Sequence, residues 1–271
     1  MEINKIYNEN CLDTMAKMPD NFIDLTVTSP PYDDLRTYNG YCFDFENVAK
    51  ELFRVTKQGG VVVWVVGDQT KNGSETGTSF RQALYFINIG FKLHDTMIYK
   101  KQDSVPLSHK RYEQCFEYMF IFVKDKIKTF NGLKDKKNVH AGELFKGTFR
   151  DLNGKMKYSS GHKNKIISDY GLRVNIWEYR TTKIIQKTHP ATFPEQLAND
   201  HIISWSNEGD LIYDPFMGSG TTAKMAILNN RKYIGSEISE EYCKIIETRI
   251  KECGGLFFNS FQTELLNEAG T

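Results

Sequence analysis

Asp214-Pro215-Phe216-Met217-Gly218-Ser219-Gly220-Thr221-Thr222 is the stretch that decides the fold. It follows an apolar run at 211–213 and precedes an amphipathic segment at 223–228, so the pattern predicts a strand, a glycine turn and a helix. The two glycines carry no Cβ, which lets the backbone of such a turn approach a ligand closely. The alternative interpretation is a tight turn between packed elements.

A second strand-like run, 232–237, ends at Glu237. In a strand–helix–strand unit, an acid roughly 20 residues beyond the glycine turn reaches the ribose hydroxyls of a bound nucleotide. Glu237 lies 17 residues beyond Gly220, so a cofactor that contains a nucleoside fits this spacing.

The bulk composition is that of an ordinary soluble globular protein. The chain has 271 residues, of which 40% are hydrophobic and 25% are charged, enough for one large α/β domain or a domain with an insertion. No apolar signal core opens the sequence and no run of about 18 apolar residues occurs, which excludes a membrane partner. The five cysteines form no C-x-x-C pair, so we expect no metal site, no disulfides and a cytoplasmic location.

Strand-like and helical segments alternate along most of the chain. This alternation predicts an α/β fold with a doubly wound, mostly parallel sheet and crossover helices. The expected strands are 3–7, 22–28, 61–66, 93–99, 116–123, 211–213 and 232–237, and the main expected helices are 45–56, 80–89, 195–206, 223–228 and 240–252.

The strand at 22–28 stops abruptly at Ser29-Pro30-Pro31-Tyr32. Two prolines cannot continue a ladder and each fixes φ, so the chain leaves the sheet in a stiff turn. Residues just past the carboxyl end of a parallel strand face the ligand crevice, where a rigid turn would hold Ser29 and Tyr32 in place. A purely structural Pro-Pro turn is the alternative.

The segment 124–187 differs from the rest of the chain in charge and pattern. It holds 16 Lys and Arg against 6 Asp and Glu, whereas the remainder holds 19 against 28. Aromatic residues are interleaved with the basic ones, and no long periodic segment occurs. This composition favours an insertion that contacts a polyanion such as DNA, with a solvated lysine-rich loop region as the alternative.

With both motifs in view, the chain resembles the amino-methyltransferases that act on exocyclic nitrogens of DNA bases. In that family a [D/N/S]-P-P-[Y/F/W] tetrad is the catalytic motif, and an F-x-G-x-G turn binds S-adenosylmethionine. Residues 29–32 and 216–220 match these motifs. The catalytic motif comes first and the basic segment lies between the two, which is the order of the β group.

The resemblance implies a fold of the S-adenosylmethionine-dependent methyltransferase type, with 1–123 as its catalytic half and 188–271 as its cofactor-binding half. The segment 124–187 becomes a basic insertion that recognises the target in double-stranded DNA. A homodimer and a cognate restriction endonuclease are further partners that the resemblance leaves open.

The motifs identify the methylated base less specifically than they identify the family. Serine at position 29 is similar to the N4-cytosine enzymes, as are His189-Pro190-Ala191 and Phe193-Pro194, so cytosine N4 is favoured and adenine N6 is the alternative. C5-cytosine methylation is disfavoured because the chain has no Pro-Cys dipeptide. Methylation of RNA or of a protein glutamine stays open, as does a catalytically silent DNA-binding relative.

The resemblance also implies a role for each site residue. The base would be flipped into the pocket and stacked on Tyr32, with its amine donating to the Ser29 hydroxyl and the Pro30 carbonyl. Pro31 completes the catalytic tetrad, and no metal is required. The residues expected to bind the cofactor are Asn10, Cys11, Thr192, Pro194, Asp214, Phe216, Gly218, Ser219, Gly220, Thr221 and Glu237.

Overall fold

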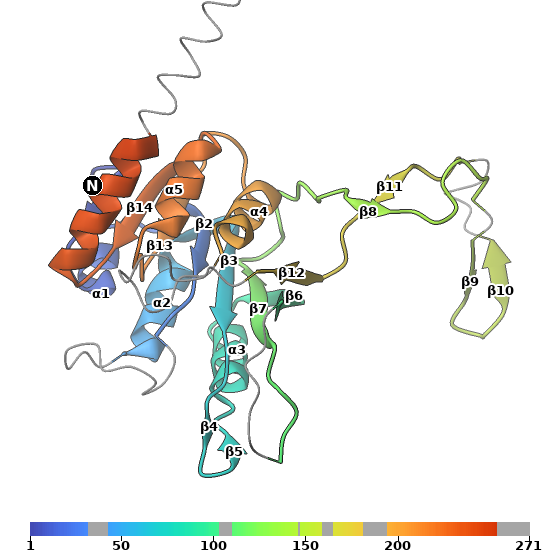
Figure 1. Ribbon diagram of the computed structural model, residues 1–271, viewed down its shortest axis with the longest axis horizontal. Coiled ribbons are helices and arrows are strands. Elements are labelled where there is room, and N and C mark those ends of the chain that lie inside the picture. Colours follow the sequence, from blue (N-terminus) through green and yellow to red (C-terminus); the bar gives the residue numbers. More distant parts are fainter. Residues whose placement is uncertain (32–42, 103–109, 146, 159–164, 181–193, 254–271) are drawn as a thin grey trace, which may run out of the picture. The chain divides into compact units, whose positions relative to one another are not determined.

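A computed structural model describes residues 1–31, 43–102, 110–145, 147–158, 165–180 and 194–253. Within these residues, eight strands form one sheet in the order β1-β14-β13-β2-β3-β7-β6-β12 (Figure 1). Every neighbouring pair is parallel except those made by β7, which runs antiparallel to both β3 and β6. The predicted doubly wound, mostly parallel sheet is confirmed.

The strands of this sheet are β1 (Lys5–Tyr7), β2 (Ile23–Thr28), β3 (Thr56–Val66), β6 (Lys92–Lys101), β7 (Phe116–Val123), β12 (Ile176–Tyr179), β13 (Leu211–Asp214) and β14 (Lys232–Ser236). The helices are α1 (Cys11–Ala16), α2 (Phe45–Val55), α3 (Thr78–Asn88), α4 (Glu195–Trp205), α5 (Thr221–Leu228) and a closing helix at 240–253. A small hairpin, β4 (Thr70–Lys71) and β5 (Ser74–Glu75), follows β3.

The prediction for 45–66 differs from the structure in one detail. We expected Gly59 and Gly60 to separate a helix from a strand at 61–66, but β3 already begins at Thr56 and contains both glycines. Gly59 adopts a φ of +79°, and a Cβ on Gly60 would lie 2.9 Å from the Asp24 carbonyl oxygen of the neighbouring chain segment. The two glycines therefore allow close approach within the sheet instead of ending an element.

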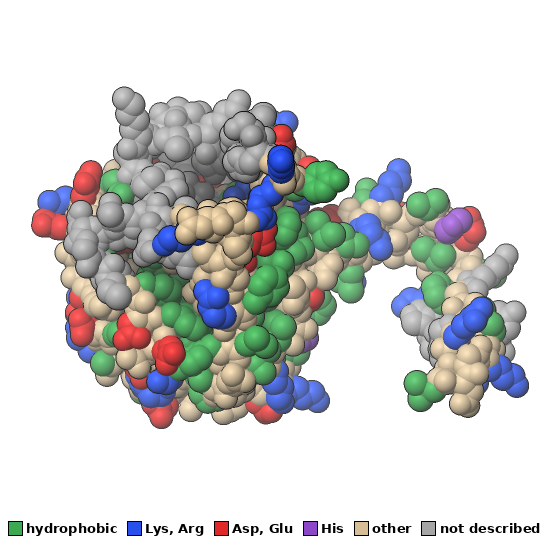
Figure 2. Space-filling model, turned by 90° about the horizontal axis from the view of Figure 1, so that it is seen from below, with side chains coloured by type: hydrophobic (Ala, Val, Ile, Leu, Met, Phe, Trp, Pro, Cys, Tyr) green, Lys and Arg blue, Asp and Glu red, His purple; other side chains and the backbone are tan. Residues whose placement is uncertain are grey.

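The chain divides into two compact units, Met1–Asn131 with Asn175–Thr271 and Gly132–Val174. The second, which we call the insertion unit, is narrower than the predicted 124–187 segment, because β12 belongs to the main sheet beside β6. The insertion unit contains the antiparallel pairs β8 (Lys136–Lys137) with β11 (Tyr170–Gly171) and β9 (Thr148–Arg150) with β10 (Met156–Tyr158). Figure 2 shows basic and apolar side chains together at its surface.

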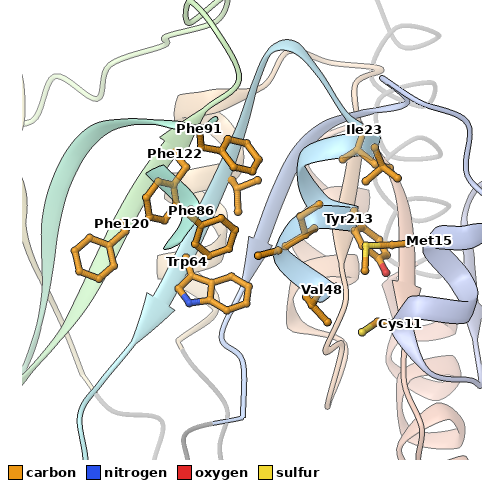
Figure 3. Packing of buried hydrophobic residues seen from close by; sticks show 14 of the residues in the cluster. Cys11, Met15, Ile23, Val48, Trp64, Phe86, Phe91, Phe120, Phe122 and Tyr213 are labelled. Atoms are coloured by element: carbon orange, nitrogen blue, oxygen red, sulfur yellow. The ribbon is translucent and has the colours of Figure 1, made fainter. Parts of the chain in front are cut away.

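Helices cover both faces of the main sheet. Helices α1, α2 and α3 pack on one face and α4 and α5 on the other. The first face carries the aromatic core, in which Trp64 and Phe86 lie with ring centroids 5.1 Å apart and Phe86 stacks on Phe122 (Figure 3). Burial of these large apolar side chains is the main source of stability for this unit. None of the helices in the described residues is long and apolar enough to span a bilayer.

Candidate active site at the carboxyl edge of the sheet

Four adjacent parallel strands end at the same edge of the main sheet. They are β1, β14, β13 and β2, and their order follows from the pairing registers. Carboxyl ends of parallel strands meet at one edge, which is where ligands bind in open α/β sheets. The segments that follow these strands are 8–10, 237–239, 215–220 and 29–31. The predicted cofactor turn and the start of the predicted catalytic motif thus follow neighbouring strands.

Asp214 joins the glycine turn to the proline corner. Its Oδ1 accepts from Thr28 Oγ1 at 2.7 Å and from Phe216 N at 3.0 Å, and its Oδ2 accepts from Thr222 Oγ1 at 2.7 Å. Thr28 directly precedes Ser29, and Thr222 lies in the first turn of α5. One buried carboxylate therefore fixes both segments at the same point of the edge.

The environment of Asp214 changes its acidity. The side chain is only 1% exposed, and burial raises its pKa to about 6, against the lowering effect of the hydrogen bonds from Thr28, Thr222 and Phe216. The carboxylate is therefore ionised at neutral pH, where it is held by three donors.

Glu237 connects the end of β14 to the same turn. Its Oε2 accepts from Gly218 N at 2.8 Å and its Oε1 accepts from Ser239 N at 2.8 Å. Burial raises the pKa of Glu237 above its ordinary value, and the Ser239 and Gly218 N–H groups act in the opposite direction. Each carboxylate oxygen has a further lone pair, so these bonds leave acceptor capacity for a ligand.

Contacts within the protein fix the conformation of the glycine turn. Gly218 and Gly220 have φ values of +54° and +83°, a region that side chains with a Cβ disfavour. A Cβ on Gly220 would lie 2.9 Å from Ile246 Cγ2 of the closing helix. Gly220 is therefore required by packing, a reason that the sequence pattern did not reveal.

The remaining cofactor candidates lie in well-defined local structures. Asn10 is the N-cap of α1, and its Oδ1 accepts from Leu12 N at 2.9 Å. Cys11, the first residue of α1, is buried in the hydrophobic core cluster, and Phe216 packs edge-on against Phe43 with ring centroids 5.3 Å apart. Pro194 is buried and precedes α4 as its N-cap.

The rest of the predicted residues have simpler positions. Ser219 and Thr221 are buried, Pro30 is buried, and Ser29 and Pro31 are half-buried. Tyr32, Thr192 and the end of the predicted basic segment, 181–187, lie outside the described residues.

Sequence reasoning missed four residues that hold this edge together: Thr28, Thr222, Glu195 and Arg249. Arg249 of the closing helix donates from Nη1 to Ser219 O and Oγ, the latter at 2.9 Å, and from Nη2 to Glu195 Oε1 at 2.6 Å. Thr28 and Thr222 flank predicted motifs, which was a usable signal. Nothing in the local sequence marks Arg249, since it lies 30 residues beyond the turn.

Comparison with known families agrees with this geometry. The model of the N6/N4 methyltransferase family, described as DNA methylase, matches residues 23–248. The chain belongs to this family. Its cofactor is S-adenosylmethionine, on which the family depends. Methyltransferases of this family modify DNA. The predicted family, fold class and cofactor are therefore confirmed.

The relatives include both close and distant proteins. The chain is 61% identical over 239 residues to the orphan methyltransferase M.BamHII of Bacillus amyloliquefaciens, covering 84% of this chain and 89% of the relative. It is 27% identical over 258 residues to the DNA adenine methyltransferase YhdJ of Escherichia coli (strain K12), covering 90% and 81% of the two chains. The crystal structure of the M1.HpyAVI–SAM complex has the same fold, with a TM-score of 0.63, 21% identity and coverage of 91% and 98%.

The residues at the edge fit such a cofactor. A buried carboxylate, Glu237, stands at the end of the strand next to the glycine turn, and the turn leads into the N-terminus of α5. Acceptors for ribose hydroxyls and a close backbone for the amino-acid part are the features that a nucleoside sulfonium needs.

Proposed function

We propose that this enzyme transfers the methyl group of S-adenosylmethionine to the exocyclic amino nitrogen of a flipped base in double-stranded DNA, with cytosine N4 favoured. The observation that carries this proposal is the Thr28–Asp214 hydrogen bond, 2.7 Å long. It ties the proline corner to the glycine turn, and a methyl donor and its acceptor have to meet between two such segments.

The cofactor contacts follow from the strand ends. Glu237 accepts from the ribose hydroxyls, and the backbone at Gly218, Ser219, Gly220 and Thr221 lies against the methionine part. Asn10 and Cys11 border the adenine, and the second lone pair of Asn10 Oδ1 accepts from the adenine amine. Thr192 and Pro194 lie near the methionine carboxylate, while Asp214 and Phe216 orient the turn. When bound, the cofactor supplies an electrophilic methyl group on a sulfonium.

The amine of the target base requires activation by the protein. Its lone pair is delocalised into the ring, so acceptors aimed at its N–H bonds favour a pyramidal nitrogen whose lone pair points at the methyl group. Ser29 Oγ and the Pro30 carbonyl are the proposed acceptors, held by the stiffness of the Pro30-Pro31 turn. Tyr32 stacks on the base, a contact typically worth about 1–3 kcal/mol.

The preference for cytosine rests on serine at the first position of the tetrad and on His189-Pro190-Ala191. Adenine N6 is the alternative, and it is supported by the relative whose name describes it as a DNA adenine methyltransferase. A flipped base of either kind presents one exocyclic amine, so the same acceptors serve both reactions.

The insertion unit is the proposed DNA-reading part. Residues 132–174 carry ten Lys and Arg against four Asp and Glu. None of the described side chains of this unit is buried, and large apolar residues such as Val139 and Leu152 are exposed with the basic ones. Basic groups bind phosphates and exposed apolar groups contact base edges, so this surface suits duplex DNA. A homodimer and a cognate endonuclease stay predictions.

The test uses purified protein, S-adenosylmethionine labelled in its methyl group and mixed-sequence duplex DNA. After hydrolysis of the DNA to nucleosides, we expect the label in N4-methylcytosine. Label in N6-methyladenine would overturn the base preference and leave the amino-methyltransferase assignment standing. Absence of label from DNA would overturn the proposed function.

Two variants address the site directly. Tyr32→Ala and Gly218→Trp should abolish labelling, because the first removes the stacking ring and the second fills the turn. Tyr112→Ala is the matched control, since Tyr112 is fully exposed and lies outside the proposed site. Undiminished transfer by either site variant would contradict the proposed roles.

A further inference from the structure

The closing helix at 240–253 contacts the glycine turn at two successive points. Ile246, fully buried, lies against Gly220, and Arg249 follows three residues later on the same face. The Arg249 Nη1 donates to the Ser219 carbonyl and, at 2.9 Å, to the Ser219 hydroxyl. One helix therefore fixes both the packing and the hydrogen bonding of the middle of the turn.

Ser219 needs a donor from outside its own element. The hydrogen-bonding of α5 starts with its N-cap, Gly220, whose carbonyl accepts from Lys224 N at 3.0 Å. Ser219 lies one residue before this cap and is 8% exposed, so its carbonyl would be poorly solvated without Arg249. A planar guanidinium can hold the carbonyl and the hydroxyl of one residue together, which an ammonium does less well.

Arg249 is itself held in place by Glu195. Its Nη2 donates to Glu195 Oε1 at 2.6 Å, and Lys224 Nζ donates to both oxygens of the same carboxylate at 2.7 and 2.9 Å. Burial raises the pKa of Glu195, but the hydrogen bonds and charges of Lys224 and Arg249 outweigh it and hold the pKa below its ordinary value. Glu195 thus stays charged at neutral pH and anchors the guanidinium.

This cluster joins two segments that the proposed function assigns to the cofactor. Glu195 is the first residue of α4 and follows Pro194 directly, whereas Ser219 lies in the glycine turn. The turn in this conformation directs Gly218 N to Glu237 Oε2. Without the guanidinium, the Ser219 carbonyl and hydroxyl lose their charged donor. The Gly218–Gly220 backbone then has fewer hydrogen bonds that fix its conformation before the cofactor binds.

We propose that Arg249 is a positioning residue for cofactor binding: anchored by Glu195, it fixes Ser219 so that the turn is formed before S-adenosylmethionine binds. This inference rests on the proposed cofactor contacts of the turn. It assigns the effect of Arg249 to affinity for the cofactor, because the guanidinium contacts the protein and not the reacting atoms.

The experiment measures the Kd of S-adenosylmethionine by calorimetry on the whole 271-residue chain. Arg249→Met keeps the aliphatic length and removes the donors, and we expect its Kd to rise about 10- to 100-fold. The Kd of Arg249→Lys should lie between those of this variant and the wild type. A lysine has a single nitrogen, which cannot bond Glu195 and Ser219 from two separate atoms as the guanidinium does. Lys251→Met, an exposed residue of the same helix, is the matched control and should change Kd less than about twofold.

Two further readouts separate positioning from a loss of fold. The kcat of Arg249→Met at saturating cofactor should stay within about threefold of the wild type. Amide exchange without cofactor should accelerate at 216–222 and not in β3 or β7, where global unfolding would also show. Glu195→Gln should weaken binding in the same direction, and the double variant should be no weaker than Arg249→Met alone, because the two residues act as one unit.

The outcomes distinguish this inference from the proposed function. If the wild type and Gly218→Trp differ in Kd while Arg249→Met binds like the wild type, the turn is the cofactor site and the role of Arg249 is refuted. Exchange that accelerates throughout the sheet in Arg249→Met would likewise refute positioning. If Gly218→Trp binds the cofactor like the wild type, the proposed cofactor site itself fails.

Discussion

The raised pKa of Asp214, the residue that joins the proline corner to the glycine turn, makes the stability of the fold depend on pH. Its folded-state pKa of about 6 lies above the ordinary value of 3.8, so the folded protein holds the proton more tightly than the unfolded chain. The stability gained in this way is fully present below pH 3.8 and is lost as the pH rises through about 6. A shift of this size corresponds to about 3 kcal/mol.

Asp214→Asn removes this titration and keeps most of the hydrogen bonds. The amide oxygen can still accept from Thr28 and Phe216, and the Thr222 hydroxyl can turn to accept from the amide. Denaturant unfolding of both proteins from pH 4 to pH 7 should show the wild type losing about 2 kcal/mol relative to the variant, because part of the whole effect already lies below pH 4. Parallel curves for the wild type and Asp214→Asn would show that burial does not raise the pKa of Asp214.

At the level of elements, the sequence predicted those whose signals are local. The strand, glycine turn and helix at 211–228 have an apolar run and two glycines within a few residues, and the structure has them as predicted. β12 was missed because it has only four residues in a lysine-rich stretch and pairs with β6, so that Ile176 lies opposite Ile98. A strand of this kind is defined by its distant partner and not by its own periodicity.

The difference between local and long-range contacts also explains which parts of the site could be predicted from the sequence. The spacing between Gly220 and Glu237 is a local property of one strand–helix–strand unit, and Glu237 does contact the turn through Gly218 N. The Thr28–Asp214 bond joins residues 186 positions apart and exists because β13 is the neighbour of β2 in the sheet. Strand order is a tertiary property that motifs alone do not specify.

The closing helix and the glycine turn make a prediction that belongs to this scale. Gly220→Ala places a Cβ at a φ of +83° and 2.9 Å from Ile246, so strain and overpacking add. We expect the free energy of unfolding to fall by about 2–4 kcal/mol. Gly73→Ala is the matched control, because Gly73 has a similar φ of +79° with nothing within 4 Å of the added Cβ.

The control should show backbone strain alone, about 1–2 kcal/mol. The difference between the two variants in denaturant unfolding therefore measures the Ile246 contact. Equal losses would mean that the closing helix moves away without cost and does not shape the turn.

At the scale of the whole molecule, the insertion unit can be removed by replacing one continuous segment of the chain. The insertion unit closes on itself where it leaves the main unit, since Arg173 N donates to Leu133 O at 2.8 Å. This is the hydrogen bond that a two-residue hairpin turn makes between its flanking residues. Replacing residues 134–172 by Asn-Gly therefore preserves this bond and removes most of the insertion unit.

The shortened protein should keep the main fold and its affinity for S-adenosylmethionine, because the described hydrogen bonds of Asp214, Glu237 and Arg249 all lie within the main unit. Its affinity for duplex DNA should fall at least about tenfold, and the plot of log K against log salt should become flatter by about 0.9 for each phosphate that the protein no longer neutralises. Calorimetry and salt titrations with one DNA duplex measure both effects. DNA binding with an unchanged salt slope would refute the DNA-reading role of the insertion unit, whereas loss of cofactor binding would show that the main unit depends on it.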